Sequence, residues 1–238
     1  MKKSVLVFIT LIIFLQPVLA SGPENLYYGF LEGSQDLGAA LQKPIEVKYW
    51  QGAMFMGLTM FTSLFDRPIY DCLANKPALK GAASILSTSV EPISLALMYT
   101  SFGWNNRELA RKMVGSTLYT QLNTNGLKYL LGKSRPYKTP ANTGPSLIGP
   151  NLNLSYNSFP SGHTAQSFSL ATVLSEEFPD YSFWFYTWSS SVGLSRIFLG
   201  RHWPSDVVGG AFVGVFSANH YLDSINKVED YKEIGYTD

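Results

Sequence analysis

Cysteine is nearly absent from this sequence, which contains only Cys72. A single cysteine excludes an intramolecular disulfide and a metal site built from several cysteines. No histidine lies near Cys72 in the sequence, so we expect a small buried apolar residue rather than a nucleophile. Reactive groups must therefore be sought among other side chains.

Charged residues are also scarce: they make up 15% of the chain, and the formal net charge is only +1. Such a balance gives no bulk attraction for nucleic acid or for an acidic surface, so no nucleic-acid partner is expected. Any anion must be bound by a few cations placed close together. Hydrophobic residues make up 46% of the 238 residues, enough for one domain with a sizeable core.

Apolar runs long enough to span a bilayer are missing as well. The longest apolar segments without a charge are 49–65, 182–195 and 207–222, with 17, 14 and 16 residues. A spanning helix needs about 20 apolar residues. We therefore predict a globular helical bundle rather than an integral membrane protein, with apolar faces that allow peripheral membrane contact.

The first twenty residues have the pattern of a secretory signal peptide. Two lysines precede an eleven-residue apolar run at 5–15, and small residues suited to signal peptidase end at Ala20. This pattern predicts cleavage after Ala20 and a periplasmic protein. An uncleaved membrane anchor is the alternative.

Helical periodicity dominates the rest of the chain, and no sustained alternation typical of strands occurs. The expected helices cover residues 46–65, 77–101, 106–132, 162–178, 181–198 and 205–222. The predicted fold class is all-α, a single-domain bundle of about six core helices with the active site between helix ends. We expect an N-terminal arm at 21–45, a helical core at 46–222 and a polar tail at 223–238.

Near the C-terminus, Arg196, His202 and Asp206 follow one another at a spacing of six and then four residues. On a helix or helical turn, His202 and Asp206 would share one face. A carboxylate on one imidazole nitrogen fixes the tautomer and leaves the other nitrogen to act as base or nucleophile. Arg196 adds a fixed positive charge suited to an oxyanion.

Two further segments offer groups for an anion. Lys128 and Arg135 would face the same way if a helix continued to Pro136, which would end it. An ordinary basic helix terminus, favoured by the helix dipole, is the alternative for these cations. Farther along, Ser161 is suited to cap a helix whose backbone N–H groups would bind a phosphate oxygen. A well-capped helix with an exposed histidine is the alternative there.

Together these segments resemble the three-part signature of the type-2 phosphatidic acid phosphatase superfamily. Its specified positions are filled by Lys128, Arg135, Pro136, Pro160, Ser161, Gly162, His163, Ser195, Arg196, His202 and Asp206. The gaps of 23 and 31 residues between the segments also fit. The resemblance implies a helical phosphatase acting on phosphomonoesters, lipid phosphates or isoprenoid pyrophosphates.

The resemblance also implies a phosphate-binding set, and phosphoryl transfer requires positive groups of this kind. Lys128, Arg135 and Arg196 would bind the phosphate oxygens as cations. Ser161 and the Gly162 backbone N–H would add neutral donors.

The remaining signature residues would carry the reaction. His202 would form a phosphohistidine, and Asp206 would orient it. His163 would protonate the leaving alkoxide and then activate water. With so many fixed cations, no metal or other cofactor is expected. His220, the third histidine, lies late in an apolar helix and is expected to be structural.

Three other functions compete with this interpretation. A vanadium-dependent haloperoxidase uses the same signature to hold vanadate but resembles much larger chains than the 218 residues after Ala20. A serine hydrolase using Ser161 would need a Gly-x-Ser-x-Gly elbow, which the sequence lacks. A non-enzymatic membrane helical protein would need apolar segments of about 20 residues.

The substrate is less well defined by the sequence. An exported, mostly non-spanning chain resembles the periplasmic acid phosphatases in location, whereas segment 192–210 is similar in texture to lipid-phosphatase members. We expect a phosphomonoesterase with access to lipid phosphates. The aromatic residues Tyr137, Tyr156, Phe159 and Trp203 would receive the part of the substrate beyond the phosphate.

Overall fold

The computed structural model describes residues 31–32, 36–38, 40–42, 49–74, 76–90, 93 and 107–233. Within these ranges the chain is helical, and its only strand-like feature is an isolated bridge between Lys133 and Leu147. The predicted all-α fold class is therefore confirmed. The predicted signal peptide at 1–20 and most of the arm at 21–45 lie outside the described residues.

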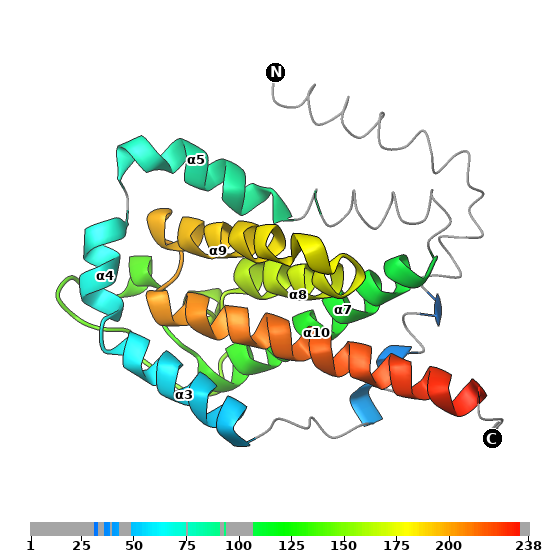
Figure 1. Cartoon of the computed structure of the whole chain (residues 1–238). Coiled ribbons are helices and arrows are strands. Elements are labelled where there is room, and N and C mark those ends of the chain that lie inside the picture. Colours follow the sequence, from blue (N-terminus) through cyan, green and yellow to red (C-terminus); the bar gives the residue numbers. More distant parts are fainter. Residues whose placement is uncertain are drawn as a thin grey trace.

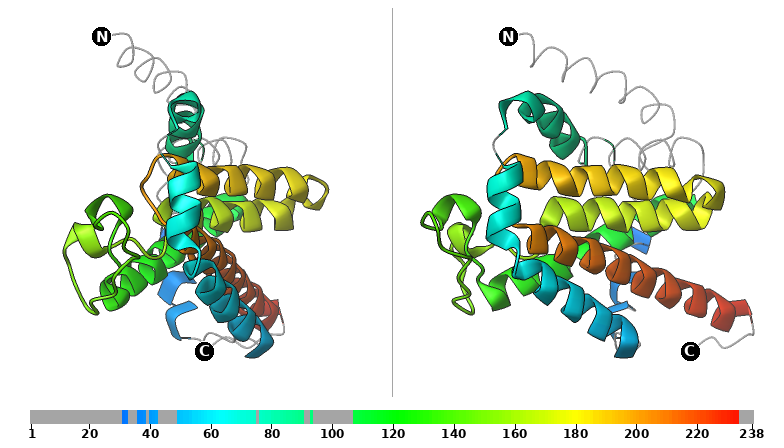
Figure 2. Two further views of the ribbon diagram at one scale, coloured as in Figure 1. Left: turned by 90° about the vertical axis from the view of Figure 1, so that its left-hand side faces the viewer. Right: turned by 60° about the vertical axis from the view of Figure 1, so that its left-hand side comes forward.

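The described α-helices are α3 (Tyr49–Ser63), α4 (Asp66–Leu73), α5 (Pro77–Thr88), α7 (Arg107–Leu131), α8 (Gly162–Glu177), α9 (Ser182–Phe198) and α10 (Pro204–Glu233). Short 3₁₀ turns form η1 (Pro136–Lys138), η2 (Leu154–Tyr156) and η3 (Pro179–Tyr181). Helix α8 packs against α7, α9 and α10, while α3 lies along α10 and α5 along α9 (Figure 1). The loop after α7 lies at the same end of the bundle as α4 (Figure 2).

Helices α8 and α10 approach closely because glycines stand where they cross. A methyl group built on Gly210 would lie 2.6 Å from the carbonyl oxygen of Ser161. One built on Gly214 would lie 2.2 Å from the carbonyl oxygen of Ala165. No side chain fits at such distances, so the two helix backbones touch. This contact brings the N-termini of α8 and α10 together.

The hydrophobic core lies toward the opposite end of these helices. It includes Met113 of α7, Leu170 and Val173 of α8, and Tyr221 and Leu222 of α10, all fully or almost fully buried. Burial of side chains of this size stabilises the fold by about 1.5–3 kcal/mol each. The end of the bundle that carries the signature residues is thus left for polar groups.

A short segment before α3 also contacts the core. Ala40 is fully buried, and its carbonyl oxygen lies 3.1 Å from the Nε2 atom of His220. The ring of His220 also stacks on Tyr119. Arg111 of α7 forms an ion pair with Asp36. His220 therefore has the structural contacts expected of it.

Some predicted boundaries were wrong. Helix α10 continues to Glu233 rather than ending at 222, because Ser224 and Ile225 remain buried and extend its packed face. Helix α7 ends at Leu131 and does not reach Arg135. Gly132 ends it with a φ of +53°, a left-handed conformation typical of glycine at a helix C-terminus.

The expectation of a buried cysteine was also wrong. Cys72 is exposed on α4, a helix that we did not predict. The buried residue of this helix is Asp66, and six residues of helix turn Cys72 about 120° away from it. The polar network around Asp66, rather than an apolar stripe, therefore decides which face of α4 points inward.

Among the described residues, no helix is both long enough and apolar enough to cross a membrane.

Candidate active site

The signature residues meet where four helix ends come together. Lys128 and Arg196 lie in the last turns of α7 and α9, while Ser161 and Asp206 lie at the starts of α8 and α10. The backbone N–H of Ser161 donates to the carbonyl oxygen of Asp206 at 2.9 Å. A methyl group built on Gly162 would lie 3.2 Å from Lys128 Nζ. Residues far apart in the sequence thus form one site.

His202 and Asp206 lie next to each other, as their spacing predicts. The Nδ1 atom of His202 is 3.4 Å from Oδ2 of Asp206, and both side chains are buried. The same oxygen accepts hydrogen bonds from the Trp203 backbone N–H at 2.9 Å and from the Ser158 hydroxyl. These donors hold the carboxylate against Nδ1 and leave Nε2 for chemistry.

The protonation states of this pair suit a nucleophilic imidazole. Burial lowers the pKa of His202 to about 4, and the positive charges of Arg135 and Arg196 act in the same direction. Burial opposes ionisation of Asp206, but Lys133 and His202 outweigh it and hold the pKa of Asp206 well below its usual range. At neutral pH the pair is therefore a neutral imidazole beside a carboxylate.

Three cations surround this pair. Burial lowers the pKa of Lys128 to about 8, and repulsion from Arg135 and Arg196 adds to the effect. Burial also lowers the pKa of Arg135. Cations that repel one another in a buried place are stabilised when they share an anion. The arrangement is suited to an oxyanion with several negative oxygens.

The two arginines are positioned by hydrogen bonds from separate elements. Arg135 donates from Nε to the side-chain oxygen of Asn157 at 2.8 Å and from Nη1 to the carbonyl oxygen of Arg201 at 3.4 Å. Arg196 donates to the hydroxyl of Ser87 in α5. The prediction that Lys128 and Arg135 share a helix face is wrong, because α7 ends between them. A turn of the chain brings Arg135 to the same site.

The start of α8 contributes the third segment. Ser161 occupies the N-cap position but makes no capping bond with its side chain. Its hydroxyl accepts a hydrogen bond from Thr164 at 2.9 Å. His163 follows in the first turn and is half-buried. Its side chain is therefore neither fully buried nor fully exposed beside the start of α8.

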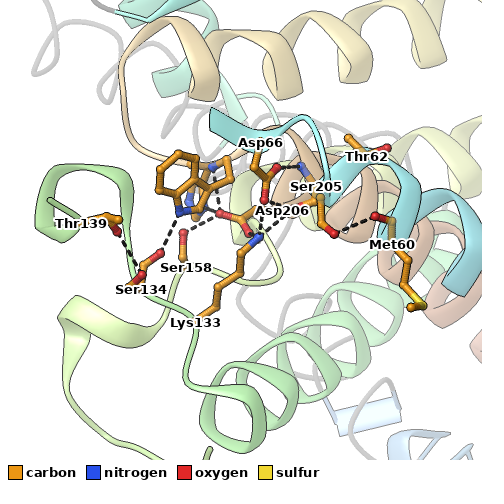
Figure 3. A network of polar contacts seen from close by, with 12 residues as sticks. Met60, Thr62, Asp66, Lys133, Ser134, Thr139, Ser158, Ser205 and Asp206 are labelled. Atoms are coloured by element: carbon orange, nitrogen blue, oxygen red, sulfur yellow. Dashed lines mark hydrogen bonds and ion pairs between the residues drawn. The ribbon is translucent and has the colours of Figure 1, made fainter. Parts of the chain in front are cut away.

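Four side chains beside Asp206 were missed at the sequence level: Asp66, Lys133, Ser158 and Ser205 (Figure 3). Lys133 Nζ lies 2.8 Å from Asp206 Oδ1 and 2.9 Å from Asp66 Oδ2. The one local signal for this network was Asp66, which directly follows the apolar segment 49–65. Its partner is 67 positions away, so the pairing could not be found from spacing.

The prediction that aromatic residues receive the substrate is wrong for two of the four, Trp203 and Phe159. Trp203 is completely buried, and its indole N–H donates to the carbonyl oxygen of Ser134 at 2.8 Å. Phe159 is also buried, and it fills the space over Gly209, where a methyl group would lie 2.3 Å from its ring. Both support the site from inside. Tyr137 is half exposed and stays a candidate, as does Tyr156.

Among the described residues, no group of three His, Cys, Asp or Glu side chains is placed to hold a metal ion.

Comparison with known proteins shows several similar chains. A lipid A 1-phosphatase of Porphyromonas gingivalis is 35% identical over 134 residues, 52% of this chain and 26% of the relative. One of Rhizobium etli is 27% identical over 191 residues, 71% of this chain and 82% of the relative. A non-specific acid phosphatase of Salmonella typhi is 46% identical over 57 residues, 24% of this chain and 23% of the relative.

These matches cover very different shares of the relatives. The chain spans only about a quarter of the Porphyromonas relative but most of the Rhizobium one. Among solved structures, Aquifex aeolicus LpxE superposes with a TM-score of 0.56 and 23% identity, covering 67% of this chain and 95% of that chain. This similarity shows a shared helical fold.

The family assignment comes from the whole pattern of the C-terminal half. The family model of the PAP2 superfamily matches residues 109–229, which is more than half of the chain and includes all three signature segments. The protein therefore belongs to the PAP2 superfamily.

Proposed function

We propose that the protein is a metal-independent phosphatase that hydrolyses phosphomonoesters through a phosphohistidine on His202. One observation carries the proposal: a buried neutral imidazole, held at Nδ1 by Asp206, lies among the positive charges of Lys128, Arg135 and Arg196. The phosphatase names of relatives within the same family support the reaction class.

In the first step, Nε2 of His202 attacks phosphorus in line with the leaving oxygen. The bond from phosphorus to that oxygen breaks, and His163 donates the proton that the departing alkoxide needs. The three cations and backbone N–H groups at the start of α8 stabilise the equatorial oxygens. The low pKa of Asp206 keeps it anionic while the imidazole becomes positive.

In the second step, His163 accepts a proton from water, and the water oxygen attacks the phosphohistidine. The bond from phosphorus to Nε2 breaks, and phosphate leaves. His202 returns to its neutral form, because burial and its cationic neighbours disfavour the imidazolium once phosphate has gone.

We extend the proposal to lipid phosphates as substrates at a membrane surface. Helix α3 has no charged residue and exposes large apolar side chains at Trp50, Met54, Met56, Met60 and Phe61, each at least half exposed. This helix leads directly into α4, whose Asp66 reaches the site. A surface of this kind fits the interface of a bilayer, with the N-terminal segment directing export to the periplasm.

Hydrolysis of para-nitrophenyl phosphate by the purified protein tests the reaction. Activity should survive EDTA, fall with orthovanadate and disappear in His202→Ala. Full activity in His202→Ala would contradict the mechanism, and loss of activity in EDTA that added metal restores would contradict metal independence.

A substrate panel tests the lipid preference. Short-chain phosphatidic acid, an isoprenoid pyrophosphate and glycerol phosphate should be compared with and without detergent micelles. We expect the highest kcat/KM for a lipid phosphate. Equal or better turnover of glycerol phosphate would overturn this part of the proposal and leave the reaction class intact.

A further inference from the structure

Behind the His202–Asp206 pair lies a second set of buried charges that the signature does not include. Lys133 Nζ contacts three groups at once: Asp206 Oδ1 at 2.8 Å, Asp66 Oδ2 at 2.9 Å and the hydroxyl of Ser205 at 2.6 Å. Lys133 is 5% exposed and the other three are at most 1% exposed. Figure 3 shows these side chains converging on one point.

Asp66 is bound firmly enough to act as an anchor for Lys133. Its Oδ1 atom accepts the backbone N–H of Ser205 at 2.8 Å, and its Oδ2 atom accepts the hydroxyl of Ser205 at 2.6 Å. Ser205 is the residue before Asp206 in the first turn of α10. Asp66 therefore ties α4 to the helix turn that carries the catalytic carboxylate.

The two oxygens of Asp206 face different partners. Oδ1 contacts Lys133, while Oδ2 accepts from Ser158 and from the Trp203 backbone and faces Nδ1 of His202. A carboxylate with both oxygens bound in this way cannot rotate. It also stays ionised in a fully buried place, because an ammonium group touches it.

We propose that Lys133 is a positioning residue, held by Asp66, which keeps Asp206 charged and turned toward His202. The inference rests on the proposed phosphatase function. Lys133 does not belong to the set of cations proposed to bind phosphate, since both carboxylates and Ser205 occupy its ammonium group. Its removal should therefore lower kcat and leave KM almost unchanged.

The main test is Lys133→Met. We expect kcat to fall about 10- to 100-fold, as is usual when a partner of a catalytic group is removed. We also expect the acid limb of the pH–rate profile to move to higher pH, because Asp206 protonates more easily without Lys133. His202, Lys128 and Arg135 are the other groups whose charges act on Asp206.

A double variant separates positioning from folding. Lys133→Met alone leaves two buried carboxylates without their cation, so the protein loses stability. Lys133→Met with Asp66→Asn removes one positive and one negative charge and should recover much of the Tm. If Lys133 positions Asp206, kcat should stay low in this double variant. Recovery of both Tm and kcat would show a purely structural role and overturn the proposal.

Two further variants complete the series. Lys133→Arg keeps the charge and should retain more kcat than Lys133→Met. Lys112→Met is the matched control, because Lys112 of α7 is also a buried lysine, paired with Glu108, Glu176 and Glu177. It should leave the pH–rate profile unchanged. A shift as large as that of Lys133→Met would contradict a specific role for Lys133.

Histidine NMR gives a readout that does not depend on turnover. The chain has three histidines, so the His202 signal can be assigned by its loss in His202→Ala. In Lys133→Met, the first protonation of the His202–Asp206 pair should move to higher pH, because a nearby positive charge is gone. An unchanged titration in a folded variant would refute the proposal.

The NMR titration also tests the role of Lys133 separately from the proposed phosphatase function. Wild-type protein without phosphatase activity, or full activity in His202→Ala, contradicts the proposed function. The coupling of Lys133 to the pair is then still decided by the titration.

Discussion

The two ends of the helical bundle bury a lysine in different ways. At the core end, Lys112 lies 2.9 Å from Glu108 and 3.5 Å from Glu176, whose side chains are 59% and 39% exposed. At the site end, the carboxylates that Lys133 contacts are almost completely buried. In both lysines burial disfavours the charge, yet neighbouring carboxylates outweigh it and raise the pKa.

The two lysines differ in whether their partner carboxylates remain hydrated. Removal of a lysine costs little free energy when its partner carboxylates remain hydrated, so ion pairs of this kind contribute little to stability. Buried carboxylates depend on their cation, because its removal leaves an uncompensated buried charge. Variants at each end of the bundle test this difference.

The largest expected effect is on activity in His202→Ala. Removal of the proposed nucleophile should lower kcat for para-nitrophenyl phosphate by at least about 10³-fold, as for other essential catalytic residues. His220→Ala, toward the other end of α10, should keep wild-type kcat, since His220 contacts Ala40 and Tyr119 instead. Steady-state kinetics of both variants would decide this. Equal losses would break the contrast between the two ends.

The two lysines should differ strongly in their effect on stability. Lys133→Met should lower the free energy of unfolding by about 3–5 kcal/mol, because it strands two buried carboxylates. Lys112→Met should lower it by about 1 kcal/mol or less. Urea denaturation monitored by circular dichroism measures both. Similar losses would mean that exposure of the partner carboxylates does not matter here.

Backbone contact at the site end gives a smaller effect. Gly210→Ala should destabilise the protein by about 1–3 kcal/mol, because the new methyl group meets the Ser161 carbonyl oxygen. It should also lower kcat by displacing the start of α8. Gly126→Ala on α7 is the control, because a methyl group there has nothing within 4 Å. It should stabilise by about 0.5–1 kcal/mol. A neutral Gly210→Ala would contradict close α8–α10 contact.

The dependence of stability on pH should report the buried histidine. The pKa of His202 is about 4 in the folded protein, against 6.5 ordinarily. The unfolded chain therefore binds a proton that the folded protein does not, and the free energy of unfolding falls as pH falls through this window. In His202→Gln, this fall should be shallower in urea denaturation. Identical slopes for variant and wild type would contradict a buried neutral imidazole.

The smallest effect is expected from Lys128→Gln in the absence of an anion. Burial and two arginines disfavour the charge of Lys128, so its removal should raise the Tm slightly at neutral pH. Orthovanadate should raise the Tm of wild type and raise that of the variant much less. Differential scanning fluorimetry measures both effects. An unchanged response to vanadate would remove Lys128 from the proposed anion site.

Features that depend on local spacing were predictable. Helical periodicity predicted α8 and α9 within one residue at either end, because each is closed by turn-forming residues. The spacing of four between His202 and Asp206 predicted their contact, because residues four apart on a helical turn are neighbours. The position of Ser161 at the start of α8 followed from a small polar residue before an apolar run.

Features that depend on contacts between distant segments were not predictable. Trp203 and Phe159 were expected to face substrate, yet packing over Ser134 and Gly209 buries them. Cys72 was expected inside, yet the pairing of Asp66 turns it outward. In each case the deciding partner belongs to another part of the chain.

The sequence was enough to predict a helical chain, and it shows cations, histidines and an aspartate in the order of a phosphatase signature. It assigned Lys128 to the signature and gave no role to Lys133, which also precedes Arg135 but fills no signature position. The tertiary structure places the ammonium group of Lys128 beside Gly162 of α8 and that of Lys133 between Asp66 and Asp206. The physical reason is that electrostatic roles depend on burial and distance, and both are set by how α4, α7 and α10 pack.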